Sequence, residues 1–337
     1  MKQVKRTHSH MVELVEVPEP QIKEPSDVKI RVHYAGICTN DIMVWDNKLH
    51  LPYDNDGIGH EFSGEIVDLG DSAREFGLCV GDRVSGLSWQ FCGKCPYCRS
   101  GRENMCINMS SFVGAMAEYI VVKDRMVCKL PDEVSMEDGC MTEAVAIALH
   151  GIQRVGIKPG DSVLIIGGGI SGQIMVQLAK MRGASSITVC EQVRSKCLLA
   201  MKQGADFTID PLKDNLVEAT DEITGSLGYD VIINISRNPE TVSLLSGLMA
   251  KGGRVLLFRQ YTLNETATLN LSELYVKECS IYTAYLAPYI LDTTVKILPK
   301  LRLSSLVGKI MPFENVQEAF ETYSSGRYPR ILMKIAK

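Results

Sequence analysis

The sequence of 337 residues lacks a long hydrophobic run, a strong excess of either charge, and any internal repeat, low-complexity tract or charged tail. Apolar runs such as Val163 to Ile166 are far short of the roughly 20 residues that span a membrane. A net charge of only -4 gives no electrostatic reason to expect nucleic acid or anionic lipid as a partner. The N-terminus does not resemble a secretion signal. These absences predict a cytoplasmic protein with neither a nucleic-acid nor a membrane partner.

Length and composition predict two globular domains. The hydrophobic fraction of 45% and the charged fraction of 23% are typical of a soluble globular protein, and the chain is too long for one ordinary core. The first part of the chain is rich in short β-like runs broken by turns with Gly-Asp pairs, which indicates a compact β-barrel-like unit. These runs cover residues 28–32, 65–67, 82–84 and 119–122.

The pattern changes from about residue 145 onward. Buried strands now alternate with helices, which predicts an α/β fold with a doubly wound parallel sheet. The expected strands are residues 162–166, 186–190, 230–235 and 254–258, and the expected helices are residues 172–181, 195–203 and 240–249.

Four of the eleven cysteines lie within fifteen residues. Their spacing, three cysteines at every third position and a fourth soon after, allows one short loop to surround a tetrahedral ion, so we expect a closed structural zinc site. Disulfide pairing is the alternative. It fits poorly because the other cysteines are scattered singly, as reduced thiols in a cytosolic protein would be. The four predicted ligands are Cys92, Cys95, Cys98 and Cys106.

A glycine-rich turn follows the first strand of the predicted parallel sheet and opens an apolar helix. A Gly-x-Gly-x-x-Gly motif alone is weak support for a dinucleotide site, but this position strengthens it. The glycines let the backbone approach a pyrophosphate, whose charge is held by the free amides at the helix N-terminus. The predicted cofactor-binding residues of this turn are Gly167, Gly169, Ile170, Ser171 and Gly172.

Glu191 ends the next strand, nineteen residues after Gly172. A carboxylate at this position would accept hydrogen bonds from the ribose hydroxyls of the adenosine and repel a 2′-phosphate, so the sequence favours NAD over NADP. Arg194 weakens this inference, because an arginine three residues further on could neutralise such a phosphate. The alternative for Arg194 is a solvated residue at the start of a helix.

Further metal-ligand residues lie apart in the sequence. Cys38 follows a strand, His60 and Glu61 are adjacent in Gly59-His60-Glu61, and Glu143 precedes the region of the parallel sheet. A cysteine, a histidine and a carboxylate, with one position left for solvent, form a ligand set that catalytic zinc accepts. Any one of these residues alone would more often be structural.

Together these motifs resemble the zinc-dependent medium-chain alcohol dehydrogenases, most closely the polyol (sorbitol-like) and threonine dehydrogenase branch. The resemblance covers nearly the whole chain, and its anchors occur in family order. They are Gly36-Ile37-Cys38, Gly59-His60-Glu61, Gly81-Asp82-Arg83-Val84, the cysteine loop, Glu143, and Lys158-Pro159-Gly160-Asp161 before the glycine turn.

The resemblance implies a GroES-like catalytic domain in residues 1–144 and 286–337, with a structural zinc lobe at about 89–108, and a Rossmann dinucleotide-binding domain in residues 145–285. It implies two zinc ions per chain, with Cys38, His60 and Glu61 as catalytic ligands and Glu143 as a fourth or exchangeable ligand. The implied reaction is hydride transfer between NAD(H) and a secondary alcohol or ketone. Glutamate at position 143 favours a polyol, a sugar or a sugar-derived hydroxyl as the substrate.

Three departures from the family pattern qualify this interpretation. Asn40 stands where relatives begin a proton relay with Ser or Thr, and an amide cannot pass a proton as a hydroxyl does, so Thr39 or a water must do so, or the relay differs. Arg237, after Ser236, and Arg259 stand where relatives typically carry glycine. We expect one of these arginines to contact an anionic group of the substrate or the cofactor, because a guanidinium matches such groups at two points. The alternative is that both are exposed loop residues.

The family resemblance also implies roles for aromatic residues. Trp45 and Leu49 are expected to line the substrate pocket. Tyr282 and Tyr285 lie on or beside an expected edge strand, where the family often forms its dimer, and we expect a homodimer or homotetramer. Two alternative functions remain: a zinc-independent reductase of an activated alkene with the same overall fold, and a non-catalytic dinucleotide-binding protein.

Overall fold

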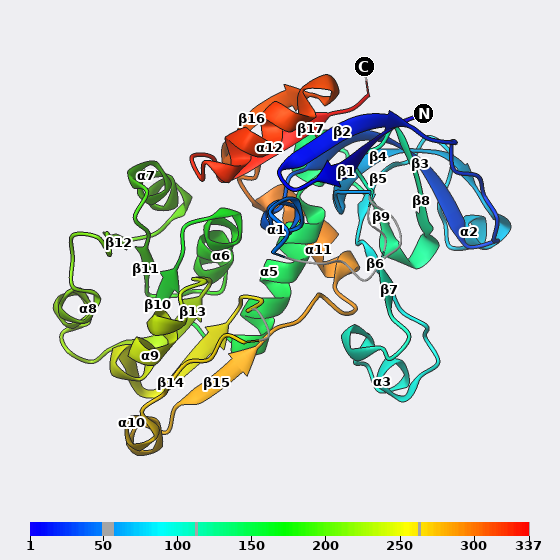
Figure 1. Ribbon diagram of the computed structural model, residues 1–337. Coiled ribbons are helices and arrows are strands. Elements are labelled where there is room, and N and C mark those ends of the chain that lie inside the picture. The colour runs from blue at the N-terminus through cyan, green and yellow to red at the C-terminus, as the bar shows by residue number, and fades with distance from the viewer. Residues whose placement is uncertain (49–56, 112–113, 262–263, 337) are drawn as a thin grey trace. The chain divides into compact units, whose positions relative to one another are not determined.

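The computed structural model describes residues 1–48, 57–111, 114–261 and 264–336. The chain divides into two compact units (Figure 1). Unit 1 contains Met1–Ala146 and Pro288–Lys337, and unit 2 contains Ile147–Ala287. The boundary at residue 146 falls within helix α5 (Thr142–Val155).

Unit 1 is built around a mixed sheet of seven strands in the order β16-β17-β3-β4-β5-β9, with β8 also paired to β3. In unit 1, β1 pairs with β2 and β6 pairs with β7 in two further small sheets. The strands of the whole unit are β1 (Lys2–His8), β2 (Met11–Glu16), β3 (Asp27–Gly36), β4 (Glu61–Leu69), β5 (Arg83–Gly86), β6 (Trp89–Gln90), β7 (Ser110–Ser111), β8 (Tyr119–Lys123), β9 (Val127–Lys129), β16 (Val307–Pro312) and β17 (Arg330–Lys334). Its helices are α1 (Thr39–Trp45), α2 (Asp71–Glu75), α3 (Pro96–Arg99), α4 (Met136–Gly139), α11 (Leu291–Ile297) and α12 (Val316–Ser324). Short 3-10 turns are η1 (Glu103–Met105), η2 (Asp124–Met126), η3 (Leu298–Lys300), η4 (Ser304–Leu306) and η5 (Phe313–Asn315).

Strand β3 is the centre of this sheet. It pairs antiparallel with β4, β8 and β17, so the two parts of the chain that form unit 1 share one sheet. β-branched residues fill the buried positions, and Ile30, Val32 and Ile66 are fully buried. The pairing of Gly36 with Glu61 places the end of β3 beside the start of β4. This pairing brings the Cys38 segment close to His60 and Glu61.

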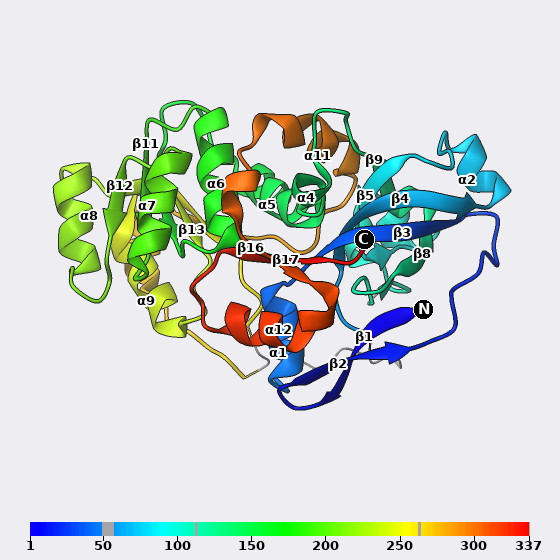
Figure 2. The same ribbon diagram turned by 90° about the horizontal axis from the view of Figure 1, so that it is seen from above.

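Unit 2 is a six-stranded parallel sheet in the order β12-β11-β10-β13-β14-β15, with helices between the strands (Figure 2). Its strands are β10 (Ser162–Ile166), β11 (Ser186–Cys190), β12 (Phe207–Ile209), β13 (Tyr229–Asn234), β14 (Met249–Leu257) and β15 (Ser280–Thr283). Its helices are α6 (Ile170–Met181), α7 (Arg194–Gln203), α8 (Leu216–Thr224), α9 (Pro239–Leu248) and α10 (Leu271–Val276).

The order of the strands reverses at β10, which pairs with β11 on one side and with β13 on the other. Open parallel sheets bind ligands outside the carboxyl ends of their strands at such a reversal. The α/β doubly wound prediction is therefore confirmed. The strands expected at residues 162–166 and 186–190 have these same limits as β10 and β11. Strand β12 and helix α8 were not expected from the sequence.

Candidate active site and metal centres

The cysteine loop lies between the two short paired strands β6 and β7. The four sulfur atoms of this loop all lie within 4.8 Å of one another, and all four cysteines are free of disulfides. The Cys95 and Cys98 sulfurs are 3.5 Å apart, whereas four thiolates at about 2.3 Å from one tetrahedral zinc ion lie about 3.8 Å apart. The spacing is therefore that of a metal cage, far longer than a disulfide bond.

The charge state of the thiols also fits a cation. Backbone N–H groups of Lys94 and Cys95 lower the pKa of Cys92 to about 6. Burial and the neighbouring thiols raise the pKa of Cys98 to about 12. Closely spaced thiols with such different pKa values do not ionise together without a counter-charge, and a bound cation supplies one. The donor set therefore fits zinc.

A second group combines Cys38, His60 and Glu61, whose ligand atoms also lie within 4.8 Å of one another. Cys38 is the N-cap of α1, and Glu61 begins β4. Glu61 is 1% exposed, and among the described residues its Oε2 atom forms an ion pair of 2.8 Å with Arg330 but meets no hydrogen-bond criterion. A buried carboxylate needs a positively charged partner, and a metal ion can serve as one beside Arg330. This donor set also fits zinc, which accepts sulfur, nitrogen and oxygen ligands together.

Asp41 holds two members of this second group, although the sequence analysis did not single it out. One carboxylate oxygen accepts a hydrogen bond from the Cys38 backbone N–H at 2.7 Å, and the other lies 3.3 Å from His60 Nδ1. Nδ1 of His60 thus faces Asp41 and leaves Nε2 for a metal. Although burial lowers the pKa of His60, Asp41 and Cys38 raise it well above its usual value. A sequence signal did exist, because Asp41 occupies the third position of the helix that Cys38 caps.

Arg330 is the second residue that the sequence analysis missed. Its guanidinium forms an ion pair of 2.8 Å with Glu61 Oε2, and both side chains are 1% exposed. The same Nη1 atom donates a hydrogen bond of 2.6 Å to the Ile37 backbone carbonyl. Gly36 makes room for this arrangement, since a Cβ atom there would collide with the Glu61 carboxylate. Arg330 lies at the start of β17, far from Glu61 in the sequence, so only the pairing of β17 with β3 brings the two together.

Glu143 lies in the first turn of α5 and is 7% exposed. The structure does not bring it into the group of Cys38, His60 and Glu61. Its pKa is nevertheless raised to about 7, mainly by burial, with His60 and Arg330 opposing the rise and Glu61 adding to it. Glu143 is therefore electrostatically linked to the site and can hold a proton near neutral pH.

The two residues after Cys38 differ in their surroundings. Thr39 is half-buried, whereas Asn40 is exposed. Trp45 is 6% exposed and packs between His10 and Phe320 in the core of unit 1. Leu49, which was expected beside it in the substrate pocket, lies outside the described residues.

In unit 2 the glycine turn has the geometry of a phosphate-binding loop. Gly167 has a φ of +114°, which favours glycine, and a Cβ atom on Gly172 would collide with the Gly167 carbonyl oxygen. Gly169 is the N-cap of α6, no side chain caps this helix by a hydrogen bond, and Ile170 and Ser171 are its first residues. Backbone amides at this helix start are suited to a pyrophosphate.

Glu191 is close to this turn. One of its carboxylate oxygens accepts a hydrogen bond from the Gly168 backbone N–H at 2.8 Å, and the other accepts one from the Val193 N–H at 2.8 Å. Each oxygen keeps a second lone pair that could accept a hydrogen bond from a ribose hydroxyl. Arg194, the first residue of α7, is exposed.

Ser236, Arg237 and Arg259 follow the adjacent strands β13 and β14 at the carboxyl edge of the sheet. Arg237 is exposed, and Ser236 and Arg259 are half-buried. The Ser236 backbone N–H donates to Asn234 Oδ1 at 3.0 Å. Both arginines therefore lie at the edge of unit 2 where ligands of such sheets bind.

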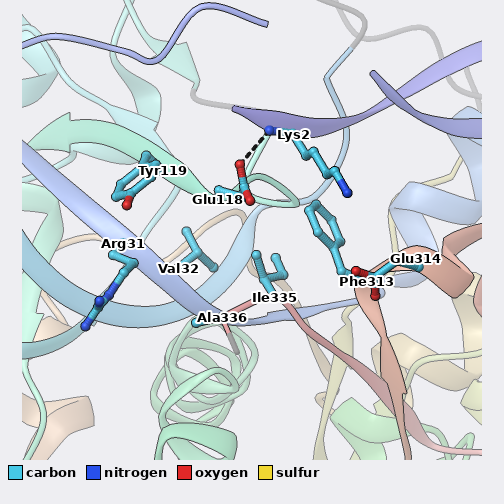
Figure 3. Close-up of a pocket in the computed structure, with 9 residues that line it drawn as sticks. All are labelled: Lys2, Arg31, Val32, Glu118, Tyr119, Phe313, Glu314, Ile335 and Ala336. Atoms are coloured by element: carbon cyan, nitrogen blue, oxygen red, sulfur yellow. Dashed lines mark hydrogen bonds between the residues drawn. The ribbon is translucent and has the colours of Figure 1, made fainter. Parts of the chain in front are cut away.

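A pocket of about 560 Å³ in unit 1 lies apart from these residues (Figure 3). Val32, Phe313 and Ile335 contribute apolar groups, and the Lys2 backbone N–H donates to the Glu118 carboxylate at 2.7 Å. Cys38, His60 and Glu61 do not line this pocket, so we assign it no part in the reaction.

Comparison with known proteins agrees with this geometry. Residues 24–132 match the alcohol dehydrogenase GroES-like domain, and residues 171–296 match the zinc-binding dehydrogenase domain. D-xylulose reductase A of Aspergillus niger is 28% identical over 334 residues, which cover 94% of this chain and 92% of the relative. D-arabitol-phosphate dehydrogenase of Enterococcus avium is 28% identical over 325 residues, which cover 93% of this chain and 92% of the relative.

A solved structure from Sinorhizobium meliloti, described as a zinc-binding dehydrogenase bound to NADP, is 26% identical, with a TM-score of 0.91 and 99% coverage of each chain. None of the helices in the described parts of our chain is both long and apolar enough to cross a membrane. The GroES-like and Rossmann expectations are confirmed by these matches and by the two sheets. The chain therefore belongs to the zinc-type medium-chain alcohol and polyol dehydrogenase family.

Proposed function

We propose that this chain transfers a hydride between NAD(H) and a secondary hydroxyl or ketone of a polyol, a sugar or a phosphorylated polyol. The observation that carries the proposal is the group of Cys38, His60 and Glu61, in which Glu61 is buried, the other two are half-buried, and Asp41 and Arg330 hold the ligands. The cysteine loop would hold a second, structural zinc ion. These two sites argue against the zinc-independent reductase, which normally lacks both ligand sets.

Zinc bound by Cys38, His60 and Glu61 would lower the pKa of a substrate hydroxyl, so that the hydroxyl can lose its proton near neutral pH. The residues of the chain orient this site. Asp41 fixes the His60 ring, and Arg330 balances the charge of Glu61. Glu143, with a pKa of about 7, can hold or release a proton beside the site. Asn40 cannot pass a proton through a hydroxyl, which leaves Thr39 or a water for that task.

The substrate class is supported by the relatives, whose names include a D-xylulose reductase and a D-arabitol-phosphate dehydrogenase. Arg237 and Arg259 would suit a phosphate, either on the substrate or in the cofactor. Replacing each arginine with glycine should lower kcat/KM by roughly tenfold to a hundredfold, the effect of about 1.5–3 kcal/mol expected of a hydrogen bond to a charged group. Unchanged constants for both substrate and cofactor would contradict this assignment.

Glu191 favours NAD over NADP, because its carboxylate would repel a 2′-phosphate. The solved relative with NADP and the position of Arg194 are the opposing observations. Turnover with each cofactor at matched concentrations would decide between them. We also propose a cytoplasmic homodimer or homotetramer, in which the edge strand β15, with Tyr282, would contribute to the contact.

The test of the function is a screen of polyols, sugar phosphates, hydroxy acids and secondary alcohols for NAD reduction at alkaline pH. The reverse ketone panel is run at neutral pH, and the zinc content is measured on the same sample. We expect two zinc ions per chain and turnover with a polyol or polyol phosphate. Full zinc content and cofactor binding without turnover in either direction would instead support a non-catalytic dinucleotide-binding protein.

A further inference from the structure

The backbone of Gly168, in the glycine turn of unit 2, is held by two side chains. Its N–H donates to a Glu191 carboxylate oxygen at 2.8 Å, and its carbonyl accepts a hydrogen bond of 2.9 Å from Gln173 Nε2. The same Nε2 atom donates at 3.0 Å to the backbone carbonyl of Lys196, in the first turn of α7. Gln173 thus joins the glycine turn to α7. The proposed function has so far given Gln173 no part.

Gln173 reaches both carbonyls because of its place in α6. It lies in the first turns of this helix, directly after the glycine turn, and its backbone N–H donates to the Gly169 carbonyl at 2.9 Å. Helices α6 and α7 lie side by side in both views (Figures 1 and 2). Carbonyl oxygens only accept hydrogen bonds, so the NH2 end of the Gln173 amide must face them. The surroundings therefore fix the orientation of this amide.

A glutamine is a costly residue at this position. Gln173 is fully buried, and the next three residues, Ile174, Met175 and Val176, are fully buried and apolar. The Gln173 Oε1 atom has no hydrogen-bond partner among the residues that the structure describes. A buried polar atom without a partner costs free energy, which an apolar side chain would avoid. Packing alone therefore does not account for the glutamine, whereas the two hydrogen bonds of its Nε2 atom do.

The hydrogen bond from Gln173 also sets the direction of a neighbouring N–H group. The Gly168 carbonyl and the Gly169 N–H belong to one planar trans peptide, in which they point in opposite directions. Because Gln173 holds the carbonyl on the buried side, the Gly169 N–H points away from it. The space beside Gly169 is open, since a Cβ atom there would meet no heavy atom within 4 Å. An N–H group at the start of a helix, facing open space, suits a pyrophosphate.

We propose that Gln173 is a positioning residue for the dinucleotide: its amide fixes the peptide between Gly168 and Gly169 so that the Gly169 N–H faces the pyrophosphate. The proposal rests on the proposed function, because it requires a dinucleotide at the glycine turn. Gln173 is fully buried, so it acts through the backbone and does not touch the cofactor. Loss of its amide should therefore weaken the binding of ligands that carry a pyrophosphate and spare ligands that lack one.

The test is calorimetric titration of the purified full chain with ADP-ribose, compared between the wild type and Gln173→Met. ADP-ribose carries the pyrophosphate but no nicotinamide, so binding is measured without turnover. Methionine keeps the length of the side chain and removes the amide. We expect the dissociation constant to rise about threefold to tenfold, as the loss of one buried hydrogen bond predicts. Gln173→Leu should show the same loss, and it replaces the methionine variant if that variant does not fold.

Two controls separate this role from simple packing. Gln177→Met changes another buried glutamine of α6, about one turn further from the glycine turn, and should leave the constant for ADP-ribose unchanged. Adenosine lacks the pyrophosphate and, measured by competition with NADH, should bind equally to Gln173→Met and the wild type. Equal ADP-ribose affinity in the Gln173 variants and the wild type, or an equal loss for adenosine, would overturn the inference while leaving the proposed function in place. A wild type that binds no ADP-ribose would instead overturn the proposed function.

Discussion

The two candidate metal centres of unit 1 are built in opposite ways. The cysteine loop takes all four donors from fifteen consecutive residues between β6 and β7. The group of Cys38, His60 and Glu61 takes its donors from two segments that meet only through the pairing of β3 with β4. The cysteine loop uses four like donors, whereas the second group mixes sulfur, nitrogen and oxygen.

The surroundings of the two centres differ as well. The second group is flanked by the buried charges of Asp41 and Arg330, and Glu143 lies near it with a raised pKa. Among the described residues, no ion pair is formed by a ligand of the cysteine loop. A closed set of four thiolates satisfies a zinc ion by itself, whereas a site that must exchange a ligand relies on charges beyond its ligands. The first centre should therefore tolerate changes in distant residues, and the second should not.

The largest expected effect concerns Arg330. Arg330→Met leaves the Glu61 carboxylate buried without its counter-charge, so we expect the free energy of unfolding to fall by about 3–5 kcal/mol. The matched control is Arg125→Met, which removes an exposed arginine beside Gly93 of the cysteine loop. This variant should change the free energy of unfolding by less than about 0.5 kcal/mol. Urea unfolding measures both. Similar losses in the two variants would mean that the centres do not differ in this respect.

The next largest effect is the change in the free energy of unfolding with pH that Glu143 causes. Its folded pKa of about 7 exceeds the ordinary value of 4.5, so the folded chain keeps a proton that the unfolded chain has released. Stability should therefore fall as pH rises from 4.5 to 7, by about 3 kcal/mol in total. The measurement compares urea unfolding of Cys38→Ser, which should not bind the catalytic metal, with that of Cys38→Ser combined with Glu143→Gln.

The double variant with Glu143→Gln should lose less stability between pH 5 and pH 8 than Cys38→Ser alone, because glutamine does not titrate. Parallel curves for the two variants would show that Glu143 does not titrate in this window.

A smaller effect is expected for Asp41. Asp41→Asn removes the charge that orients His60 and should weaken metal binding at the second group by about tenfold to a hundredfold. Zinc in the cysteine loop should be unaffected. Asp46→Asn, a change at the other end of α1, is the control and should alter neither site. Zinc content after dialysis against a weak chelator measures the difference, and equal retention by both variants would count against the role of Asp41.

The smallest effect is expected at the cysteine loop. The Tyr289 hydroxyl donates a hydrogen bond of 3.1 Å to the Cys98 carbonyl, but Tyr289 is 63% exposed. Tyr289→Phe should therefore lower the free energy of unfolding by no more than about 1 kcal/mol and leave both zinc ions in place. Loss of the structural zinc in this variant, measured by metal analysis, would show that this loop also depends on a distant residue.

The sequence predicted the elements whose signals are local. The first strands of the parallel sheet, the glycine turn and the cysteine loop each depend on neighbours within a few residues, and so periodicity and spacing were sufficient to find them. Strand β12 is only three residues long, and two of these are exposed, so it carries almost no hydrophobic pattern. Helix α8 has a single buried residue, Thr220, for the same reason.

For the second metal group, the sequence alone determined which residue types were available: a cysteine after a strand, a His-Glu pair, and a glutamate further on. Only the tertiary structure decided which of them meet. It brought Cys38, His60 and Glu61 together, left Glu143 outside this group, and added Arg330 from the C-terminal segment. The physical reason is that strand pairing joins residues hundreds of positions apart, and the charge balance of a buried site depends on every group that this pairing brings near, which no spacing along the chain records.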